Sequence, residues 1–214
     1  ILKTRFVDNY SKNKINGIYD INDDILDLKE EKELARKVSQ NISKYDLVLV
    51  VDYGHGFLTP KNIDLIQKKS KFLAVNTQLN SLNYGYHSIS KYKKADYICI
   101  HDGELRYDYR NKNEKTEKLV IKLNNKIKSK IITITKGSKG SLCYRNNKFT
   151  YCPAFANKIV DRVGAGDTLL AITSLCNKLK VPLEITLLLG NLAAANTISA
   201  MGTGGILNKV DIIN

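Results

Sequence analysis

Short apolar runs alternate along this chain with longer segments in which apolar residues recur every three or four positions. The runs are rich in isoleucine and valine, which is typical of strands in a parallel sheet. The amphipathic segments between them predict helices. Strands are expected at residues 46–51, 72–75, 97–100 and 131–135, and helices at 28–42, 60–69 and about 114–128. The alternation predicts an α/β fold, a mostly parallel sheet flanked by helices.

Local signals sharpen several boundaries. Thr59 is a capping residue type and Pro60 suits a first helical position, so a helix is expected to begin there. The run at 46–51 is expected to be buried on both faces, as the strands of parallel sheets are. Residues 3–10 and 15–21 are expected to form two paired strands.

A hairpin is expected further along, from residues 141–145 and 148–152 around the turn Asn146-Asn147. That turn would set Cys143 opposite Thr150. A later helix is expected to run to about residue 178, Pro182 to start another, and the apolar residues 187–200 to be buried. No linker or repeat divides residues 46–200, so a single α/β domain is the simplest organisation.

The stretch from Asp161 to Ala171 combines a glycine turn with the start of a helix. Gly164 and Gly166 tolerate backbone angles that other residues resist, and they let a ligand approach the main chain. The first N–H groups of the helix would lack internal partners and lie at the positive end of its dipole, where an anion is stabilised. Asp167 is also a capping residue type, so the same letters fit a capped helix that binds nothing.

Composition narrows the classes of function. The chain carries 34 basic and 21 acidic residues, a net charge of +13, but its lysines are spread out and no aromatic platform for bases accompanies them. Nucleic-acid binding is therefore not expected, and an anionic small substrate fits the charge at least as well. The 4 cysteines have neither zinc-ligand nor disulfide spacing. We expect free thiols and a soluble, cytoplasmic protein without a membrane partner, because no secretory signal or bilayer-length apolar run is present.

Several glycine- or carboxylate-bearing segments are expected at the sheet edge where ligands bind in such folds. They are residues 101–104, 135–140, 164–167 and 190–205. In this order they resemble the ribokinase-like (PfkB) carbohydrate kinases. The resemblance is strongest to the heptose 7-phosphate kinases of that family and covers nearly the whole chain. It rests on Lys3-Thr4-Arg5, Asp52-Tyr53-Gly54 and Gly164-Ala165-Gly166-Asp167-Thr168.

The resemblance implies ATP-dependent phosphorylation of a sugar or sugar phosphate. It implies that Asp167 is the general base and that the turn of Gly164, Ala165 and Gly166 forms the anion hole for the transferring phosphoryl group. It also implies that Mg²⁺ binds through water to Glu104. The implied nucleotide contacts are Thr135, Lys136, Gly137, Gly140, Asn191 and Gly202. The implied substrate contacts are Asp52, Arg5 and Asp167, although Asp52 equally fits a purely turn-making role.

Two further features are implied only by relatives of this kind. Asp161 together with residues 201–205 is a candidate K⁺ site, and the first strands are a candidate surface for a homodimer. Residues 1–22 resemble part of the family's β lid, and residues 23–214 resemble its α/β core with the ATP site but without the first βα units. Together with a start at Ile1 and a single methionine, Met201, this indicates a fragment or a processed chain.

Two positions depart from the family pattern. His101 stands where the family has asparagine, and histidine is a poor ligand for Mg²⁺. Arg162 stands where a smaller hydroxyl or apolar residue is commoner, and it would either meet a phosphate or lie in solvent. These departures leave open a nucleotide-binding regulatory module without turnover. A ribose, fructose or nucleoside kinase of the same fold is also left open.

Overall fold

A six-stranded sheet forms the centre of the molecule. The computed structural model describes residues 2–10, 14–22, 24–80, 83–156, 160 and 163–199. In this part of the chain the strand order is β3-β4-β5-β6-β7-β8; β3 to β6 are parallel, and β7 and β8 continue the sheet as an antiparallel hairpin. The strands are β3 Val48–Asp52, β4 Leu73–Thr77, β5 Lys94–His101, β6 Lys128–Thr135, β7 Ser141–Arg145 and β8 Lys148–Cys152.

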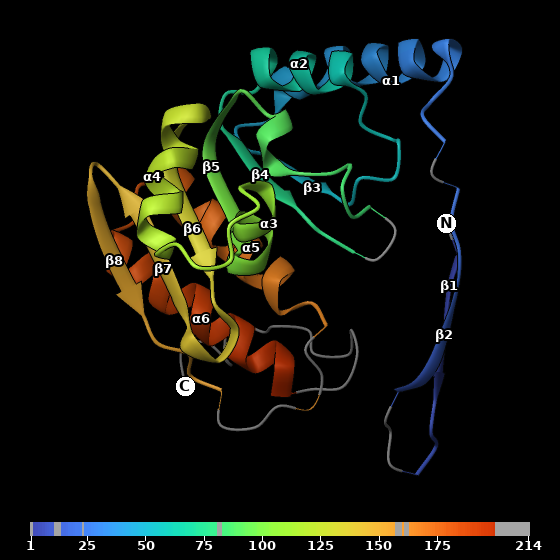
Figure 1. Cartoon of the computed structure of the whole chain (residues 1–214). Coiled ribbons are helices and arrows are strands. Elements are labelled where there is room, and N and C mark those ends of the chain that lie inside the picture. The colour runs from blue at the N-terminus through green and yellow to red at the C-terminus, as the bar shows by residue number, and fades with distance from the viewer. Residues whose placement is uncertain are drawn as a thin grey trace.

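Helices cover both faces of this sheet, so the body has three layers (Figure 1). Helices α1 to α4 lie on one face, and α5 and α6 pack together on the other. The helices are α1 Leu28–Asn41, α2 Pro60–Lys69, α3 Asp102–Asp108, α4 Thr116–Lys126, α5 Ala165–Lys178 and α6 Leu183–Ser199. Short 3₁₀ turns are η1 Ile42–Lys44, η2 Ile89–Lys91 and η3 Gly137–Lys139.

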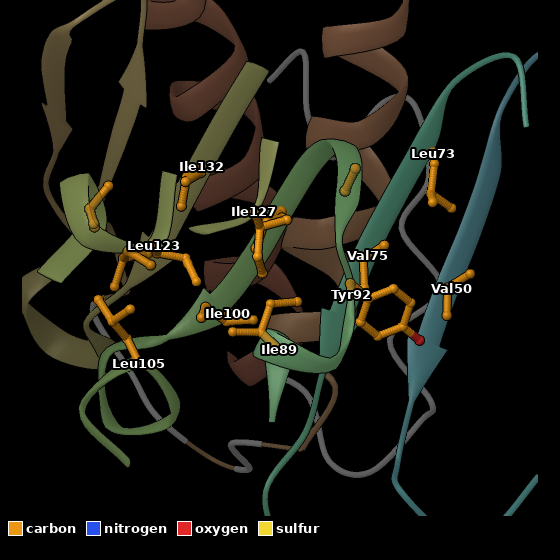
Figure 2. Packing of buried hydrophobic residues seen from close by; sticks show 14 of the residues in the cluster. Val50, Leu73, Val75, Ile89, Tyr92, Ile100, Leu105, Leu123, Ile127 and Ile132 are labelled. Atoms are coloured by element: carbon orange, nitrogen blue, oxygen red, sulfur yellow. The ribbon is translucent and has the colours of Figure 1, made fainter. Parts of the chain in front are cut away.

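Alternate side chains of β5 belong to two separate apolar cores, one on each face of the sheet. Ile98 and Ile100 join the core under α2, α3 and α4, whereas Tyr97 and Cys99 join the core under α5 and α6. Figure 2 shows Ile100 in the first of these cores, with Leu105 and other labelled residues of the cluster. Burial on both faces explains why this strand reads as a continuous apolar run.

Most of the predicted elements are confirmed. Thr59 caps α2 by accepting a hydrogen bond from the Asn62 N–H at 3.4 Å, and Pro60 is its first residue. In the hairpin Cys143 pairs with Thr150, as the two-residue turn predicted. The cysteines are free thiols and all are buried. Within the residues described, no helix is long and apolar enough to cross a membrane.

Two expectations were wrong. Strand β3 is not buried on both faces, because it is the outer strand of the sheet in the described part of the chain, and Leu49 is 39% exposed. Residues 101–104, expected as a carboxylate-bearing loop at the sheet edge, form no loop: His101 is the last residue of β5, and residues 102–104 begin α3. A helix follows β5 without an intervening loop because His101 ends the strand and also caps the helix.

A separate two-stranded sheet lies at the start of the chain. Strands β1 (Leu2–Val7) and β2 (Lys14–Asp20) pair antiparallel, as predicted, and every residue of β1 is exposed. In Figure 1 this ribbon extends away from the α/β body. The division into residues 1–22 and 23–214 stays a prediction.

Candidate active site

The carboxyl ends of the parallel strands lie along one edge of the sheet, where open α/β folds bind ligands. Asp52 ends β3, Thr77 ends β4, His101 ends β5 and Thr135 ends β6. His101 and Thr135 are direct neighbours in the register of β5 and β6. The segments that follow these strands therefore start close together although they are distant in sequence.

Helix α5 begins with an open N-terminus. Gly164 precedes the helix with a φ of 85°, a left-handed conformation that glycine adopts easily, and no side chain of the described residues caps the helix. The Thr168 N–H donates to the Gly164 oxygen over 2.9 Å. The N–H groups of Ala165, Gly166 and Asp167 have no partner within the helix and lie at the positive end of its dipole.

The alternative that Asp167 caps this helix is wrong. Gly164 occupies the cap position and Asp167 is the third helical residue. Within the described ranges the Asp167 carboxylate accepts no hydrogen bond. Its side chain reaches solvent, yet partial burial raises the pKa of the carboxyl group above the ordinary aspartate value. An unpaired carboxylate with a raised pKa is well suited to accept a proton.

The negative charge of Asp167 acts on two other groups at the sheet edge. Burial raises the pKa of Tyr53, the residue after β3, and the charge of Asp167 raises it further. Burial is also the main cause of the raised pKa of Glu104 in α3, to which Asp167 contributes. The start of α5 therefore lies near the carboxyl ends of β3 and β5.

Glu104 is fixed by backbone groups on both sides. Its carboxylate accepts hydrogen bonds from the His101 N–H at 2.7 Å and from the Leu79 N–H at 3.1 Å. In return, Nδ1 of His101 accepts from the Gly103 N–H at 3.0 Å, which completes a capping box. Histidine at position 101, where the resemblance leads us to expect asparagine, thus has a structural role, since the imidazole caps α3.

The carboxylates at this edge are of the kind that a magnesium ion accepts as ligands. Mg²⁺ prefers oxygen ligands and usually takes several of them from water and substrate phosphates, with only one or two protein carboxylates. Glu104 and Asp167 are two such groups, close enough for the charge of one to raise the pKa of the other. No group of three or more His, Cys, Asp or Glu side chains in the described residues forms a metal cluster. The residues present fit a largely water-bound ion.

The glycine loop after β6 is tightly wound. The Lys136 N–H donates to the Gly140 oxygen at 2.8 Å, and both Gly137 and Gly140 have positive φ, 59° and 79°. A Cβ at Gly140 would lie 2.0 Å from the Cys152 oxygen, whereas one at Gly137 would meet nothing within 4 Å. Gly140 is therefore required by packing, and Gly137 leaves the outer side of the loop open to a ligand.

Asn191 connects helix α6 to this loop. Its side-chain amide is buried and donates to the Ser141 hydroxyl at 2.7 Å and to the Leu187 oxygen at 2.8 Å. Ser141 is the residue immediately after Gly140, so Asn191 fixes the end of the loop. Its implied contact with the nucleotide stays a prediction.

The turn after β3 is closed by internal contacts. The Asp52 carboxylate is 4% exposed, accepts from the Gly54 N–H at 3.0 Å and the Tyr92 hydroxyl at 2.6 Å, and pairs with Lys91 Nζ at 2.6 Å. Nε2 of His87 lies 2.8 Å from the Asp52 backbone oxygen. These contacts show the turn-making role, and substrate contact by Asp52 stays a prediction.

The two-stranded sheet also reaches this edge. Lys3 Nζ lies 5.4 Å from the centre of the Tyr53 ring, within range of a cation–π interaction. Arg5 lies on the same strand and is exposed. Neither Lys3 nor Tyr53 was among the predicted site residues, although both stand in the motifs Lys3-Thr4-Arg5 and Asp52-Tyr53-Gly54 that carried the resemblance.

Some predicted residues lie outside the described part of the chain. These are Gly202, predicted to contact the nucleotide, Asp161 and residues 201–205, predicted as the K⁺ site, and Arg162. Their roles stay predictions.

Comparison with known sequences gives a consistent result. The bifunctional protein HldE of Campylobacter curvus is 28% identical over 176 residues, which cover 81% of this chain and 37% of that protein. The bifunctional protein HldE of Campylobacter fetus is 30% identical over 179 residues, covering 80% of this chain and 37% of its own length. The chain therefore spans well under half the length of these curated relatives.

Solved structures share the fold. Phosphofructokinase-2 from Escherichia coli, in complex with potassium, has a TM-score of 0.80 at 16% identity, over 99% of this chain and 68% of that one. Ribokinase from Thermotoga maritima has a TM-score of 0.74 at 18% identity, with the same coverages of 99% and 68%. At these identities the likeness shows a ribokinase-like fold.

The profile of the family described as "pfkB family carbohydrate kinase" matches residues 16–209, nearly the whole chain. This match agrees with the ribokinase-like fold and with the order of glycine loop, hairpin and open helix N-terminus along the sheet edge. This chain belongs to the pfkB family of carbohydrate kinases, phosphotransferases that act on sugar hydroxyls.

Proposed function

We propose that this protein phosphorylates a sugar or sugar phosphate with ATP and that Asp167 is the general base. The observation that carries the proposal is the open start of α5, where the Asp167 carboxylate, which has no hydrogen-bond partner among the described residues, follows N–H groups without helical partners. Phosphoryl transfer needs a proton acceptor at the attacking hydroxyl and donors for the charge on the transferring group. One short turn supplies both.

In the proposed step, the sugar hydroxyl gives its proton to a carboxylate oxygen of Asp167 while its oxygen bonds to the γ-phosphorus of ATP. The bond between that phosphorus and the bridging oxygen breaks, and ADP leaves with the electron pair. The N–H groups of Gly164, Ala165 and Gly166 donate to the oxygens of the transferring group and stabilise their charge. Their positions are fixed before substrate binds, because the helix holds them.

The nucleotide is proposed to lie along the glycine loop. Thr135, Lys136, Gly137 and Gly140 would follow its phosphates, and the open outer side of Gly137 supports this placement. Asn191 and Gly202 are also proposed to contact the nucleotide. Mg²⁺, held through water by Glu104, would neutralise part of the phosphate charge.

The proposed acceptor is a sugar phosphate of the heptose type, contacted by Arg5 and Asp52. The similarity to the HldE proteins and the residues Lys3-Thr4-Arg5 support this choice over ribose, fructose or a nucleoside.

A K⁺ ion at Asp161 and residues 201–205 is proposed from the potassium complex of the Escherichia coli structure. A homodimer through the exposed strand β1 is proposed on its exposure alone.

The pH dependence of kcat/KM tests the role of Asp167. Because burial raises the pKa of this carboxyl, we expect the acid limb of the wild-type profile to lie above the ordinary aspartate value of about 3.9. Asp167→Asn should lack that limb and be slower by roughly 10²- to 10⁴-fold, as for loss of a general base. ATP binding, measured by calorimetry, should be retained. If Asp167→Asn keeps the acid limb of the wild-type profile, the proposal is contradicted. If the wild-type protein binds ATP but forms no ADP in response to sugar, a regulatory module is favoured instead.

A further inference from the structure

The turn that carries the candidate base is held on both sides by the end of helix α6. Before the turn, the Val160 N–H donates to the Ile198 oxygen at 2.8 Å. After it, the Thr197 hydroxyl donates to the hydroxyl oxygen of Thr168, the residue that follows the base, at 3.0 Å. Two adjacent residues of one helix therefore hold the chain just before and just after the turn.

Thr197 contacts both ends of the turn with one side chain. A Cβ at Gly164 would lie 3.6 Å from Cγ2 of Thr197, so the threonine methyl group faces the residue that precedes α5. The backbone joins the same two ends, because the Thr168 N–H donates to the Gly164 oxygen at 2.9 Å. The methyl group of Thr197 thus lies against the start of the turn, and its hydroxyl is bound to the end.

The Thr197 side chain is itself fixed. It is buried, and its hydroxyl also lies 3.0 Å from the Ala193 oxygen, one turn earlier in α6. The branched Cβ of threonine restricts rotation about χ1, and a hydrogen bond to the preceding turn of the helix selects one rotamer. The hydroxyl is therefore directed at Thr168 before any substrate binds.

Helix α6 is a firm support for this contact. A Cβ at Gly190 would lie 2.5 Å from Cγ2 of Thr173 in α5, so the two helices approach closely at that point. The next residue, Asn191, donates to the Ser141 hydroxyl at the end of the glycine loop. Thr197 follows Asn191 after a rise of about 9 Å along the helix. The same helix therefore holds the glycine loop and the turn of the base.

We propose that Thr197 is a positioning residue for phosphoryl transfer, which holds the turn from Gly164 to Asp167 in the conformation that aligns the base with the N–H donors. It acts through Gly164 and Thr168 rather than by touching ATP or the acceptor. A displacement of about 1 Å can slow an oriented reaction by roughly 10²-fold, so the loss of one hydroxyl that fixes the turn is expected to lower the rate. The inference rests on the proposed kinase function and adds a residue to it.

The test compares Thr197→Val, which keeps the methyl group but loses the hydroxyl, with Thr197→Ser, which keeps the hydroxyl but loses the methyl group. Initial rates of ADP formation are measured with ATP and heptose 7-phosphate. In Thr197→Val, kcat should fall by roughly 10- to 100-fold while KM for either substrate is unchanged, because only the alignment in the transition state is lost. Thr197→Ser should keep kcat within about threefold, since the hydrogen bond can still form.

Thermal midpoints separate positioning from a purely structural role. Thr197→Ser loses a buried methyl group and should melt at a lower temperature. Thr197→Val should melt close to wild type, because the partner that it leaves, Thr168, is only partly buried. If the role were purely structural, the less stable serine variant would be the slower enzyme. Thr186→Val removes a buried hydroxyl at the other end of α6 and is the matched control, for which kcat should not change.

Amide hydrogen exchange gives a second readout that needs no activity. The Thr168 N–H, which donates to the Gly164 oxygen, should exchange severalfold faster in Thr197→Val than in wild type or in Thr197→Ser. Exchange in strand β5 should be the same in all three proteins.

The inference is overturned if Thr197→Val keeps the wild-type kcat, if folded Thr197→Ser is slowed as much as Thr197→Val, or if exchange at Thr168 is unchanged in Thr197→Val. None of these results touches the kinase function, which fails if Asp167→Asn keeps the wild-type pH profile. The two proposals therefore fail on different measurements.

Discussion

Two turns at the same edge of the sheet carry aspartates in opposite surroundings. Asp52, after β3, is 4% exposed and its carboxylate is occupied by Gly54, Lys91 and Tyr92. Asp167, in the first turn of α5, reaches solvent and accepts no hydrogen bond from the described residues. A position at the ligand-binding edge therefore does not by itself identify a reactive carboxylate. What distinguishes the reactive one is that its oxygens are not already used in hydrogen bonds.

These different surroundings also indicate different roles for the two turns. The closed turn holds Tyr53 and connects β3 to η2 through Lys91, so its carboxylate stabilises the fold. The open turn exposes N–H groups and a carboxylate with a raised pKa, which costs some stability but prepares the site for charge that develops during reaction.

The largest effect on stability is expected at the closed turn. Asp52→Asn leaves the Lys91 ammonium without its counterion, and we expect a loss of about 3 kcal/mol in the free energy of unfolding, the low end for a broken buried pair because Lys91 reaches solvent. Urea denaturation measures it. The double variant Asp52→Asn/Lys91→Met should recover part of the loss, and a loss below about 1 kcal/mol would mean that the turn is not closed by this pair.

A pair of glycines sharpens the comparison at the open turn. Gly164→Ala should cost about 1–2 kcal/mol, because alanine resists the φ of 85°. Gly166→Ala has room for its Cβ and no positive φ, so it should raise stability by about 0.5–1 kcal/mol, as expected inside a helix. Yet its methyl group would enter the space proposed for the transferring phosphoryl group and lower kcat.

Thermal melts and steady-state rates of both variants check this. A Gly166→Ala variant that is more stable and fully active would contradict the proposed anion hole.

The smallest effect is a pH dependence at the closed turn. Burial lowers the pKa of His87, aided by Lys91 and opposed by Asp52. The unfolded chain then binds the proton more readily, so stability is full above the unfolded pKa of about 6.5 and falls as the pH drops below it. The thermal midpoint should decrease from pH 7 to pH 5, less so in His87→Gln. Equal decreases in both proteins would assign the effect to other groups.

The elements that local signals specify could be predicted from the sequence. Thr59 and Pro60 fix the start of α2, and Asn146 and Asn147 both adopt the positive φ that their turn needs. Such signals act over a few residues and need no knowledge of the rest of the fold.

Contacts between distant residues could not be predicted. The Tyr92 hydroxyl that occupies Asp52 is 40 residues away in sequence, and Asn191 lies 50 residues from Ser141. The place of β3 beside β4, as the outer strand in the described part of the chain, depends on which strands pair, and its apolar composition does not reveal this. Asp167 was predicted as the base from the sequence. That Asp52 differs from it, because its carboxylate is occupied, is visible only from the hydrogen bonds in the folded structure.

The most direct test of the difference between the two turns measures sugar-dependent ADP formation and thermal stability of Asp167→Asn and Asp52→Asn side by side, at a temperature where both variants are folded. We predict that Asp167→Asn loses roughly 10²- to 10⁴-fold in kcat while its thermal midpoint stays the same or rises slightly, because the partly buried charge is removed. Asp52→Asn should instead lose stability while keeping kcat within about tenfold, a barrier change near 1.4 kcal/mol, because its proposed contact with the acceptor would affect KM rather than kcat. Wild-type kcat in Asp167→Asn, or a loss of activity in folded Asp52→Asn as large as that expected for Asp167→Asn, would contradict this account.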